Sequence, residues 1–219
     1  GCGVDISTLR PKGAEVHNAA LTTSGAVSFM DVMEQTARVI GQNGRRGALM
    51  ISMDSSHPDI HDFIDAKLDN KLEKCNISVR MSDDDMEDRP DILDHIAANN
   101  YDWAEPGILY WDTIKRYNLL DEFANFEYAG VNPCAEEPLP AGGSCLLGAL
   151  NLSEFVENPF TDKAAFNIPE FKGAVRIAIR ALNNVLDEGL ELHPLEEQRE
   201  SVRDWRQIGL GIMGFADML

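Results

Sequence analysis

Short apolar runs alternate with amphipathic segments along most of this chain. The short runs predict strands at residues 3–7, 48–53, 75–81, 126–131 and 145–150. Apolar positions that recur near the 3.6-residue period predict helices at residues 27–40, 60–68, 101–117 and 169–190. Strands that alternate with helices are typical of the α/β fold class. About five strands are too few for a closed barrel, so the pattern fits a half-barrel or an incomplete barrel.

Two glycine-rich segments interrupt this pattern. Residues 41–47 hold three glycines and two adjacent arginines, and they predict a loop whose backbone can come close to a ligand. Residues 206–216 also carry closely spaced glycines. A dinucleotide-binding fingerprint would need them between a strand and a helix, with an acidic residue further on, so we expect a tight packing turn instead.

Composition narrows the range of functions. The net charge of −18 argues against broad nucleic-acid binding, because a phosphate backbone needs a basic face. No apolar run reaches the length of a membrane helix. Four cysteines at wide, irregular spacing do not form a disulfide framework, which favours a cytoplasmic protein with reduced thiols. The chain starts at Gly1 and enters a strand at once, so we expect a piece of a longer polypeptide.

A loop at residues 130–146 concentrates the reactive side chains. Within it, Asn132, Cys134, Glu136 and Cys145 supply an amide, two thiols and a carboxylate. Its prolines exclude a helix and its glycines permit sharp turns. Because strands are predicted on both sides, we expect a finger that rises from a sheet, with Cys134 near the tip and Cys145 at the base. Cys2 and Cys75 are interpreted as small core residues.

The sequence Asn132-Pro133-Cys134-Ala135-Glu136 resembles the radical-bearing finger loop of ribonucleotide reductase catalytic subunits. Other stretches of the same family follow in the family's order, at residues 3–13, 42–48, 57–60, 76–79, 105–107 and 209–211. The resemblance implies a ten-stranded α/β barrel with the finger loop at its centre, of which residues 1–219 would be the middle part. The second reducing cysteine, the phosphate-binding turns and the C-terminal shuttle cysteines would then lie outside this sequence.

Residue chemistry agrees with the roles that the resemblance implies. A cysteine thiyl can exchange a hydrogen atom with a sugar C–H, and Cys134 on a constrained loop could be held against the ribose. Glu136, two residues on, could accept the 3′-hydroxyl proton as general base. Asn132 offers a donor and an acceptor for the ribose hydroxyls. Cys145 would be one of two thiols that supply the reducing electrons.

Basic and amide side chains predict the nucleotide contacts. By the resemblance, the glycine-rich loop reads base identity and couples it to an allosteric nucleotide. A guanidinium can stack on a base or hold phosphate, and amides can pair with base edges. A solvated turn is the alternative for this loop. The expected substrate- or effector-binding residues are Gln42, Asn43, Gly44, Arg45, Arg46 and Gly47, with Arg10 and Lys12 in a second effector-site loop.

The expected function is reduction of ribonucleotides, as a ribonucleoside-diphosphate reductase. The Asn-Pro-Cys form and the ten residues between Cys134 and Cys145 look most like the adenosylcobalamin-dependent class. The alternative is the class whose radical comes from a separate metal-containing subunit. The expected partners are a ribonucleotide, a nucleoside triphosphate effector, a thioredoxin-like or dithiol reductant and a second copy, with no nucleic acid, membrane or metal.

Two other function classes remain as alternatives. A cysteine and carboxylate metal or redox module is disfavoured, because the thiols lack CxxC spacing and the five histidines do not group with them. A non-catalytic nucleotide-binding fragment is the other, since half a barrel exposes unpaired strand edges.

Overall fold

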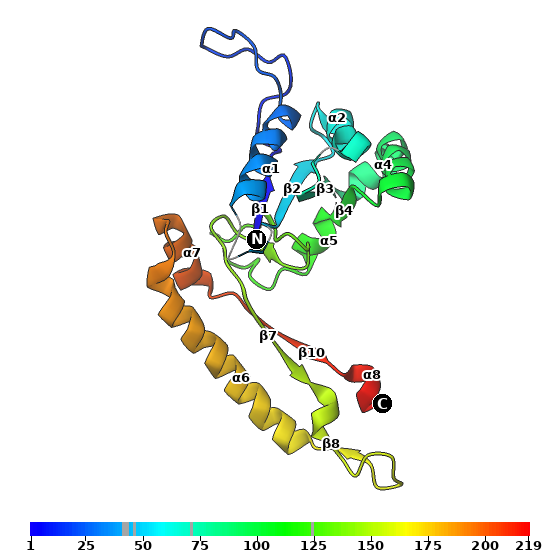
Figure 1. Cartoon of the computed structure of the whole chain (residues 1–219), viewed down its shortest axis with the longest axis vertical. Coiled ribbons are helices and arrows are strands. Elements are labelled where there is room, and N and C mark those ends of the chain that lie inside the picture. Colours follow the sequence, from blue (N-terminus) through cyan, green and yellow to red (C-terminus); the bar gives the residue numbers. More distant parts are fainter. Residues whose placement is uncertain (41–43, 46, 71, 124) are drawn as a thin grey trace. The chain divides into compact units, whose positions relative to one another are not determined.

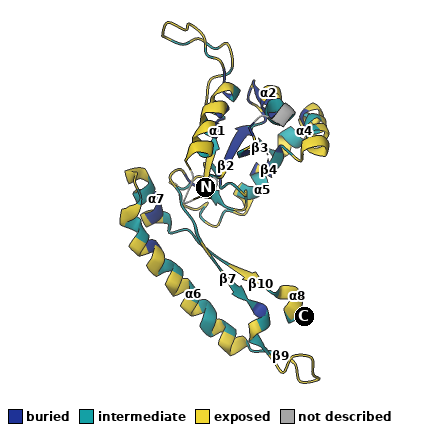
Figure 2. Cartoon of the chain, in the orientation of Figure 1, coloured by how far each residue is buried: buried dark blue, intermediate teal, exposed yellow. Residues whose placement is uncertain are grey.

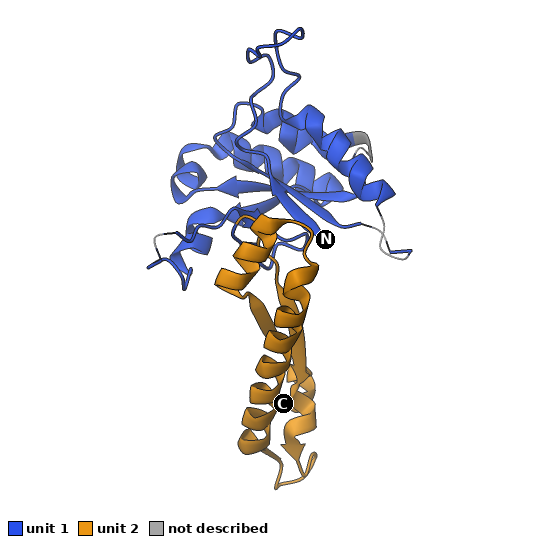
Figure 3. Cartoon of the chain, turned by 90° about the vertical axis from the view of Figure 1, so that its left-hand side faces the viewer, with its two compact units in different colours: residues 1–140 blue, residues 141–219 orange. Residues whose placement is uncertain are grey.

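The computed structural model describes every residue except 41–43, 46, 71 and 124. The chain divides into two compact units, residues 1–140 and 141–219, which Figure 3 colours separately. The expected α/β class is confirmed, because parallel strands alternate with helices in both units.

A four-stranded parallel sheet is the centre of unit 1, and its spatial order is the same as its order in the chain. Each new strand therefore adds beside the previous one, without the reversal that marks a doubly wound sheet. This one-directional winding is what part of a barrel requires. The strands are β1 (Cys2–Asp5), β2 (Leu49–Asp54), β3 (Cys75–Met81) and β4 (Gly107–Tyr110).

Helices cover one face of this sheet and form the main core (Figure 1). Alternate strand residues such as Ile51, Ile77 and Val79 point into that core and are at most 1% exposed. Phe63 and Met30 reach them from the helices and are fully buried. Figure 2 shows β2 in the dark blue of buried residues, whereas β1 at the edge of the sheet is exposed to partly buried. The covering helices are α1 (Met30–Val39), α2 (Ile60–Ile64) and α4 (Pro90–Trp103).

Shorter elements connect these parts. The hydroxyl of Ser82 accepts a hydrogen bond from Asp85 N at 3.0 Å and so caps α3, which has three aspartates in its first turn. The last elements of unit 1 are the two strands of a hairpin, β5 and β6. The shorter elements are η1 (Val27–Phe29), η2 (Asp65–Asn70), α3 (Asp83–Asp88), α5 (Trp111–Arg116), β5 (Gly130–Val131) and β6 (Pro138–Leu139).

Unit 2 is a parallel strand pair with one long helix packed along it. Leu182 of that helix lies over Gly148, where an added Cβ would be 3.5 Å from the leucine side chain. Asn167 caps the helix by accepting a hydrogen bond from Glu170 N at 3.0 Å. The elements are β7 (Leu146–Asn151), η3 (Leu152–Phe155), β8 (Val156–Glu157), β9 (Ala165–Phe166), α6 (Ile168–Gly189), η4 (Leu190–Leu192), α7 (Glu196–Trp205), β10 (Ile208–Met213) and α8 (Phe215–Met218).

Three predicted elements were wrong. The helix expected at 101–117 is interrupted by β4, because Pro106 and Gly107 break it and Ile108 then faces the helix-covered core. The turn expected at 206–216 contains β10, whose glycines belong to a strand paired with β7. Of the strand expected at 126–131, only Gly130–Val131 is extended and paired.

No helix among the described residues is long and apolar enough to cross a membrane.

The contact of Ser55 with Asp85 joins the turn after β2 to α3. Ser55 is fully buried, and its hydroxyl donates to Asp85 Oδ2 at 2.7 Å. This hydrogen bond is the main reason that the pKa of Asp85 lies below its ordinary value, and a second bond from Ser82 adds to it.

We predict that Ser55→Ala lowers the free energy of unfolding by about 1 kcal/mol at neutral pH, because the carboxylate loses its buried donor. A lowered folded-state pKa stabilises the fold above the unfolded pKa of about 4, and that stabilisation is lost as the pH falls through the folded pKa. Urea denaturation from pH 7 downward should therefore show the variant and wild type converging in acid.

Ser56→Ala is the control, since Ser56 is exposed and its hydrogen bonds among the described residues go to its near neighbour Asp54. An equal loss for both variants, or a difference that does not change with pH, would contradict the assignment.

Candidate functional site

A tight hairpin holds three of the predicted catalytic residues together. Gly130 pairs with Leu139 and Val131 with Pro138, which closes residues 132–137 into a loop. Inside this loop, Ala135 N donates to the Asn132 carbonyl at 3.0 Å, and Ala135 adopts a left-handed φ of +67°. The backbone therefore turns sharply beside Cys134.

Asn132 is part of the frame of this loop. Its backbone N donates to the Glu137 carbonyl at 3.2 Å, and its side-chain Oδ1 accepts from Glu137 N at 3.1 Å. The amide oxygen, expected to contact the ribose, therefore braces the turn. Among the described residues its Nδ2 has no hydrogen-bond partner, so it keeps two donor hydrogens for a ligand.

Cys134 and Glu136 are both exposed, whereas Ala135 between them is partly buried and packs on the sheet. The loop therefore directs its apolar residue inward and presents the thiol and the carboxylate to solvent, two residues apart. A bound molecule could reach both groups at once.

The hairpin packs on the sheet face that the helices leave uncovered. Val131 and Ala135 contact a small cluster built on Met50, Leu109 and Trp111. Val131 is 4% exposed, so the base of the hairpin is fixed by burial of apolar surface.

Gly3 in the first strand and Gly1 just before it allow this close approach. A Cβ on Gly3 would lie 1.7 Å from the Val131 carbonyl oxygen, and a Cβ on Gly1 would lie 2.5 Å from Pro133 Cγ. No side chain fits at residue 3 while the hairpin keeps its place.

A polar network supports the same face beneath the hairpin. Asp5 accepts from Ser52 Oγ at 2.7 Å and pairs with Arg80 Nη1 at 3.0 Å. The guanidinium of Arg80 lies over the Trp111 ring, 3.9 Å from its centroid. These contacts fix the indole against which the hairpin cluster packs.

One hydrogen bond joins the turn of the hairpin directly to the sheet. Asn76 Nδ2 donates to the Pro133 carbonyl at 2.8 Å.

Near the base of the hairpin, burial and then the charge of Glu137 raise the pKa of Tyr128, which keeps that phenol protonated.

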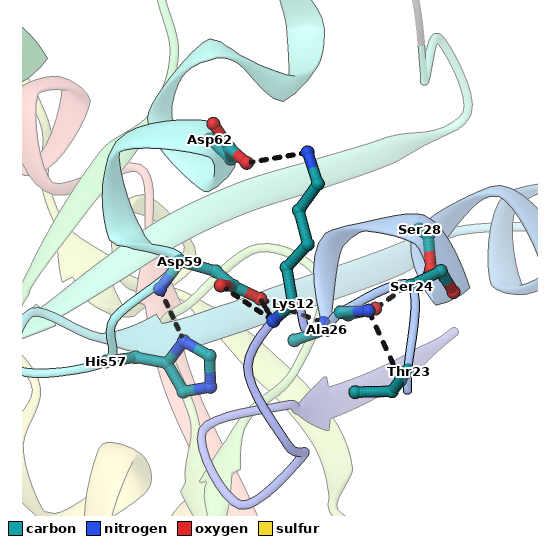
Figure 4. Close-up of polar contacts among 9 residues, drawn as sticks. Lys12, Thr23, Ser24, Ala26, Ser28, His57, Asp59 and Asp62 are labelled. Atoms are coloured by element: carbon teal, nitrogen blue, oxygen red, sulfur yellow. Dashed lines mark hydrogen bonds and ion pairs between the residues drawn. The ribbon is translucent and has the colours of Figure 1, made fainter. Parts of the chain in front are cut away.

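The loop after β1, which carries Arg10 and Lys12, is anchored through Asp59 (Figure 4). Both Asp59 oxygens accept from Lys12 N, at 3.0 and 3.1 Å, and Oδ2 also accepts from Ala26 N at 3.1 Å. Gly25, with a φ of +95°, leaves room for that carboxylate, since a Cβ there would be 2.8 Å from Oδ2.

His57 completes this anchor from the same turn as Asp59. Its Nε2 bonds to the Leu9 carbonyl at 2.9 Å, and its Nδ1 accepts from Asp59 N at 3.0 Å. The ring is 6% exposed and is therefore a buried brace for the loop. The side chain of Arg10 is left exposed, and Lys12 Nζ lies 3.9 Å from Asp62 at a solvent-accessible position.

The glycine-rich loop is described only in part. Gln42, Asn43 and Arg46 lie outside the described residues, so their predicted contacts stay predictions. Gly44 has a φ of +84°, and it and Arg45 are exposed. Gly47 has a packing role as well, because a Cβ there would be 2.4 Å from the carbonyl oxygen of Ala37 at the end of α1.

The remaining cysteines have distinct environments. Cys145 lies partly buried just before β7, in unit 2, whereas Cys134 belongs to unit 1. Burial raises the pKa of Cys75 to about 11, which agrees with a core residue that remains a thiol. Cys2 is exposed, so its interpretation as a core residue was wrong. Among the described residues, no group of three or more metal-binding side chains occurs.

Sequence reasoning did not identify Asn76, Asp59 or Gly3 as site residues. Each lies in a stretch that carried the family resemblance, but its individual role depends on a partner far along the chain. For Asn76 the available signal was an amide among the polar residues that alternate with apolar ones along its strand. For Gly3 it was a glycine inside a predicted strand, which often marks a close backbone approach.

The chain is similar to known proteins along its whole length. The family model described as "Ribonucleotide reductase, barrel domain" matches residues 1–90 and 88–219. The chain is 36% identical to the vitamin B12-dependent ribonucleoside-diphosphate reductase of Thermoplasma acidophilum, covering all of this chain and 31% of that protein. It is 33% identical to the protein of the same name from Mycobacterium tuberculosis, covering all of this chain and 34% of that protein.

A solved structure shares the fold. The class Id ribonucleotide reductase alpha subunit of Actinobacillus ureae matches 99% of this chain and 41% of its own, with a TM-score of 0.76 and 20% identity. The chain spans about a third of the length of the curated relatives that it matches.

We predict that Gly3→Ala displaces the hairpin, because its Cβ would meet the carbonyl oxygen of Val131. Overpacking against a backbone atom should lower stability by about 1–3 kcal/mol and raise the rate at which iodoacetamide alkylates Cys134. Thermal unfolding and peptide mass spectrometry measure the two effects.

Gly130→Ala is the matched control, since a Cβ there would be 4.0 Å from the Asp5 Cβ, an ordinary contact. If both variants alkylate at the wild-type rate, the close packing of the hairpin on β1 does not control the position of Cys134.

Proposed function

This chain belongs to the ribonucleotide reductase family, and from that premise we propose that it is the central part of a catalytic barrel that converts ribonucleotides to 2′-deoxyribonucleotides. The observation that carries the proposal is the fixed hairpin, which exposes Cys134 and Glu136 together. In the whole protein the hairpin would be the tip of a finger loop, residues 130–146, inside a ten-stranded barrel.

Cys134 would carry the radical. A 2′-hydroxyl is a poor leaving group on an unactivated sugar, and a radical at the neighbouring 3′-carbon makes its loss feasible. The Cys134 thiyl takes the 3′-hydrogen atom and becomes a thiol, and the same hydrogen atom returns to the 3′-carbon at the end. Its exposed position beside a rigid turn suits a group that must meet one face of a ribose.

Glu136 would act as general base. It accepts the proton of the 3′-hydroxyl while the 2′-hydroxyl leaves as water, with the proton for that water supplied by a thiol of the reducing pair. The donor hydrogens of Asn132 would hold a ribose hydroxyl, since its amide oxygen is used by the loop.

Cys145 would supply reducing equivalents. The reaction consumes two electrons, which two thiols provide when they become a disulfide, and the substrate oxygen leaves as water. The second thiol of the pair would come from a part of the protein outside this sequence. A thioredoxin-like or dithiol reductant would then reduce the disulfide.

We propose adenosylcobalamin as the radical source, in line with the names of the vitamin B12-dependent relatives. The Cys134 thiol is exposed, so a separately bound radical source would have access to it. When bound, adenosylcobalamin supplies a carbon radical that can remove the hydrogen atom from a thiol. The alternative is a radical delivered by a separate metal-containing subunit.

The proposed substrate and effector rest on the relatives' names and on the exposed basic side chains. A ribonucleoside diphosphate is the proposed substrate, as the names of the relatives state for those proteins. Arg10, Lys12 and Arg45, whose side chains are exposed, would contact a nucleoside triphosphate effector. A homodimer in the cytoplasm is the proposed setting.

We predict that the full-length protein forms deoxyribonucleotide from a ribonucleoside diphosphate and a dithiol only when adenosylcobalamin is added. Cys134→Ser should abolish turnover, because a hydroxyl does not form a comparable radical. Cys2→Ser, at an exposed thiol of the neighbouring strand β1, should keep wild-type turnover. Product formation is measured by chromatography.

Activity in Cys134→Ser would remove the basis of the proposal. Activity that depends on an added radical-generating subunit and not on cobalamin would keep the family chemistry and overturn the proposed radical source.

We predict that Glu136→Gln lowers kcat by about 100-fold, the usual contribution of a general base. Its neighbour Glu137→Gln should lose little, because the hydrogen bonds recorded for Glu137 use its backbone. Initial rates at saturating substrate should fall in Glu136→Gln alone. Equal losses in the two variants would contradict the assignment.

A further inference from the structure

The turn that carries Cys134 is tied to the sheet at a single polar point. The other hydrogen bonds of residues 132–137 stay within the hairpin: Ala135 to Asn132, and two between Asn132 and Glu137. Among the described residues, the bond from Asn76 Nδ2 to the Pro133 carbonyl oxygen, at 2.8 Å, is the one that joins this segment to another element.

The atom that Asn76 holds belongs to the peptide unit of Cys134. The Pro133 carbonyl and the Cys134 N–H lie in one plane, because the peptide bond does not rotate freely. The Cys134 Cα lies in the same plane, so holding the carbonyl oxygen restrains the direction of the N–Cα bond from which the Cys134 side chain departs. The side chain of Cys134 makes no hydrogen bond of its own among the described residues, so this backbone contact is the one through which the sheet can control the direction of its sulfur.

Its position in β3 places Asn76 next to the turn of the hairpin. Side chains alternate along β3, so Cys75 and Ile77 enter the helix-covered core while Asn76 points to the hairpin face. Asn76 pairs in register with Met50, a member of the cluster that buries Val131. The amide therefore stands next to the apolar contact that fixes the base of the hairpin.

The hairpin is thus fixed by two different means. Apolar burial of Val131 and the missing side chain at Gly3 set how close its base lies to the sheet. Those contacts are not directional enough to orient the turn above them, whereas a hydrogen bond is.

We propose that Asn76 is a positioning residue, which orients the Cys134 sulfur for hydrogen-atom transfer by holding the Pro133–Cys134 peptide. This inference rests on the proposed function of Cys134. Asn76 itself does not touch the reacting atoms. Its loss should slow the chemical step and leave substrate binding intact, because misplacing a reacting group by about 1 Å can cost about 100-fold in rate.

The test uses the full-length protein with Asn76→Asp, which keeps the size of the side chain but replaces the donor with an acceptor. Asn76→Leu is a second variant that removes the polar group. The matched control is Asn100→Asp, because Asn100 Nδ2 makes the same kind of bond, at 3.0 Å, to the Pro106 carbonyl, away from the hairpin.

The expected result is a kcat at least about 10-fold lower in both Asn76 variants, with KM and melting temperature close to wild type. In protein without cofactor, iodoacetamide should alkylate Cys134 at a changed rate relative to Cys2, as followed by peptide mass spectrometry. Asn100→Asp should change neither kcat nor the alkylation ratio.

Wild-type kcat and alkylation in the Asn76 variants would overturn this inference. So would losses of kcat that are matched in Asn100→Asp or explained by a lower melting temperature, since these indicate a general structural role. Neither result bears on the role of Cys134, which fails separately if Cys134→Ser stays active.

Discussion

The carbonyl oxygen of Val131 occupies the space where a side chain at residue 3 would otherwise be. This approach of two backbones brings the hairpin onto the surface of the sheet, and the other features of the candidate site depend on it. With the base so close, Val131 is buried against Met50 and Trp111, and Asn76 can reach the turn. The exposed thiol and carboxylate are therefore held by main-chain and apolar contacts made elsewhere in the loop.

The four-stranded sheet separates two tasks by its alternating side chains. One face is lined by apolar side chains and packs against three helices, and this core holds most of the buried apolar residues of unit 1. The other face carries the ion pair of Asp5 with Arg80 and the amide of Asn76. Burial of polar groups is costly unless they are paired, and here each contributes to the support of Trp111 or of the hairpin. Stability and chemistry are thus assigned to opposite faces of the same strands.

The loop after β1 follows the same principle. Asp59 and His57 hold its backbone through main-chain N–H and carbonyl groups, while the cationic side chains of Arg10 and Lys12 remain outside. A ligand could meet those side chains without disturbing the anchor. Fixed backbone with accessible side chains is therefore common to the candidate effector loop and the candidate catalytic hairpin, and it favours preorganisation for binding and for catalysis.

The sequence by itself determined the α/β class, most strands and helices, and the reactive residue types at 132–136, because these depend on local periodicity and on neighbours in the chain. It did not determine that 107–110 is a strand or that the glycines near 209 lie in one, since pairing with a distant strand overrides local turn preference. Nor did it reveal that Gly3 admits Val131, that Asp59 anchors the loop at Lys12, or that Asn76 holds the peptide of Cys134. Those relations join residues 47 to 128 positions apart, and only the tertiary structure decides them, because a hydrogen bond or a steric limit exists only once both partners are brought together.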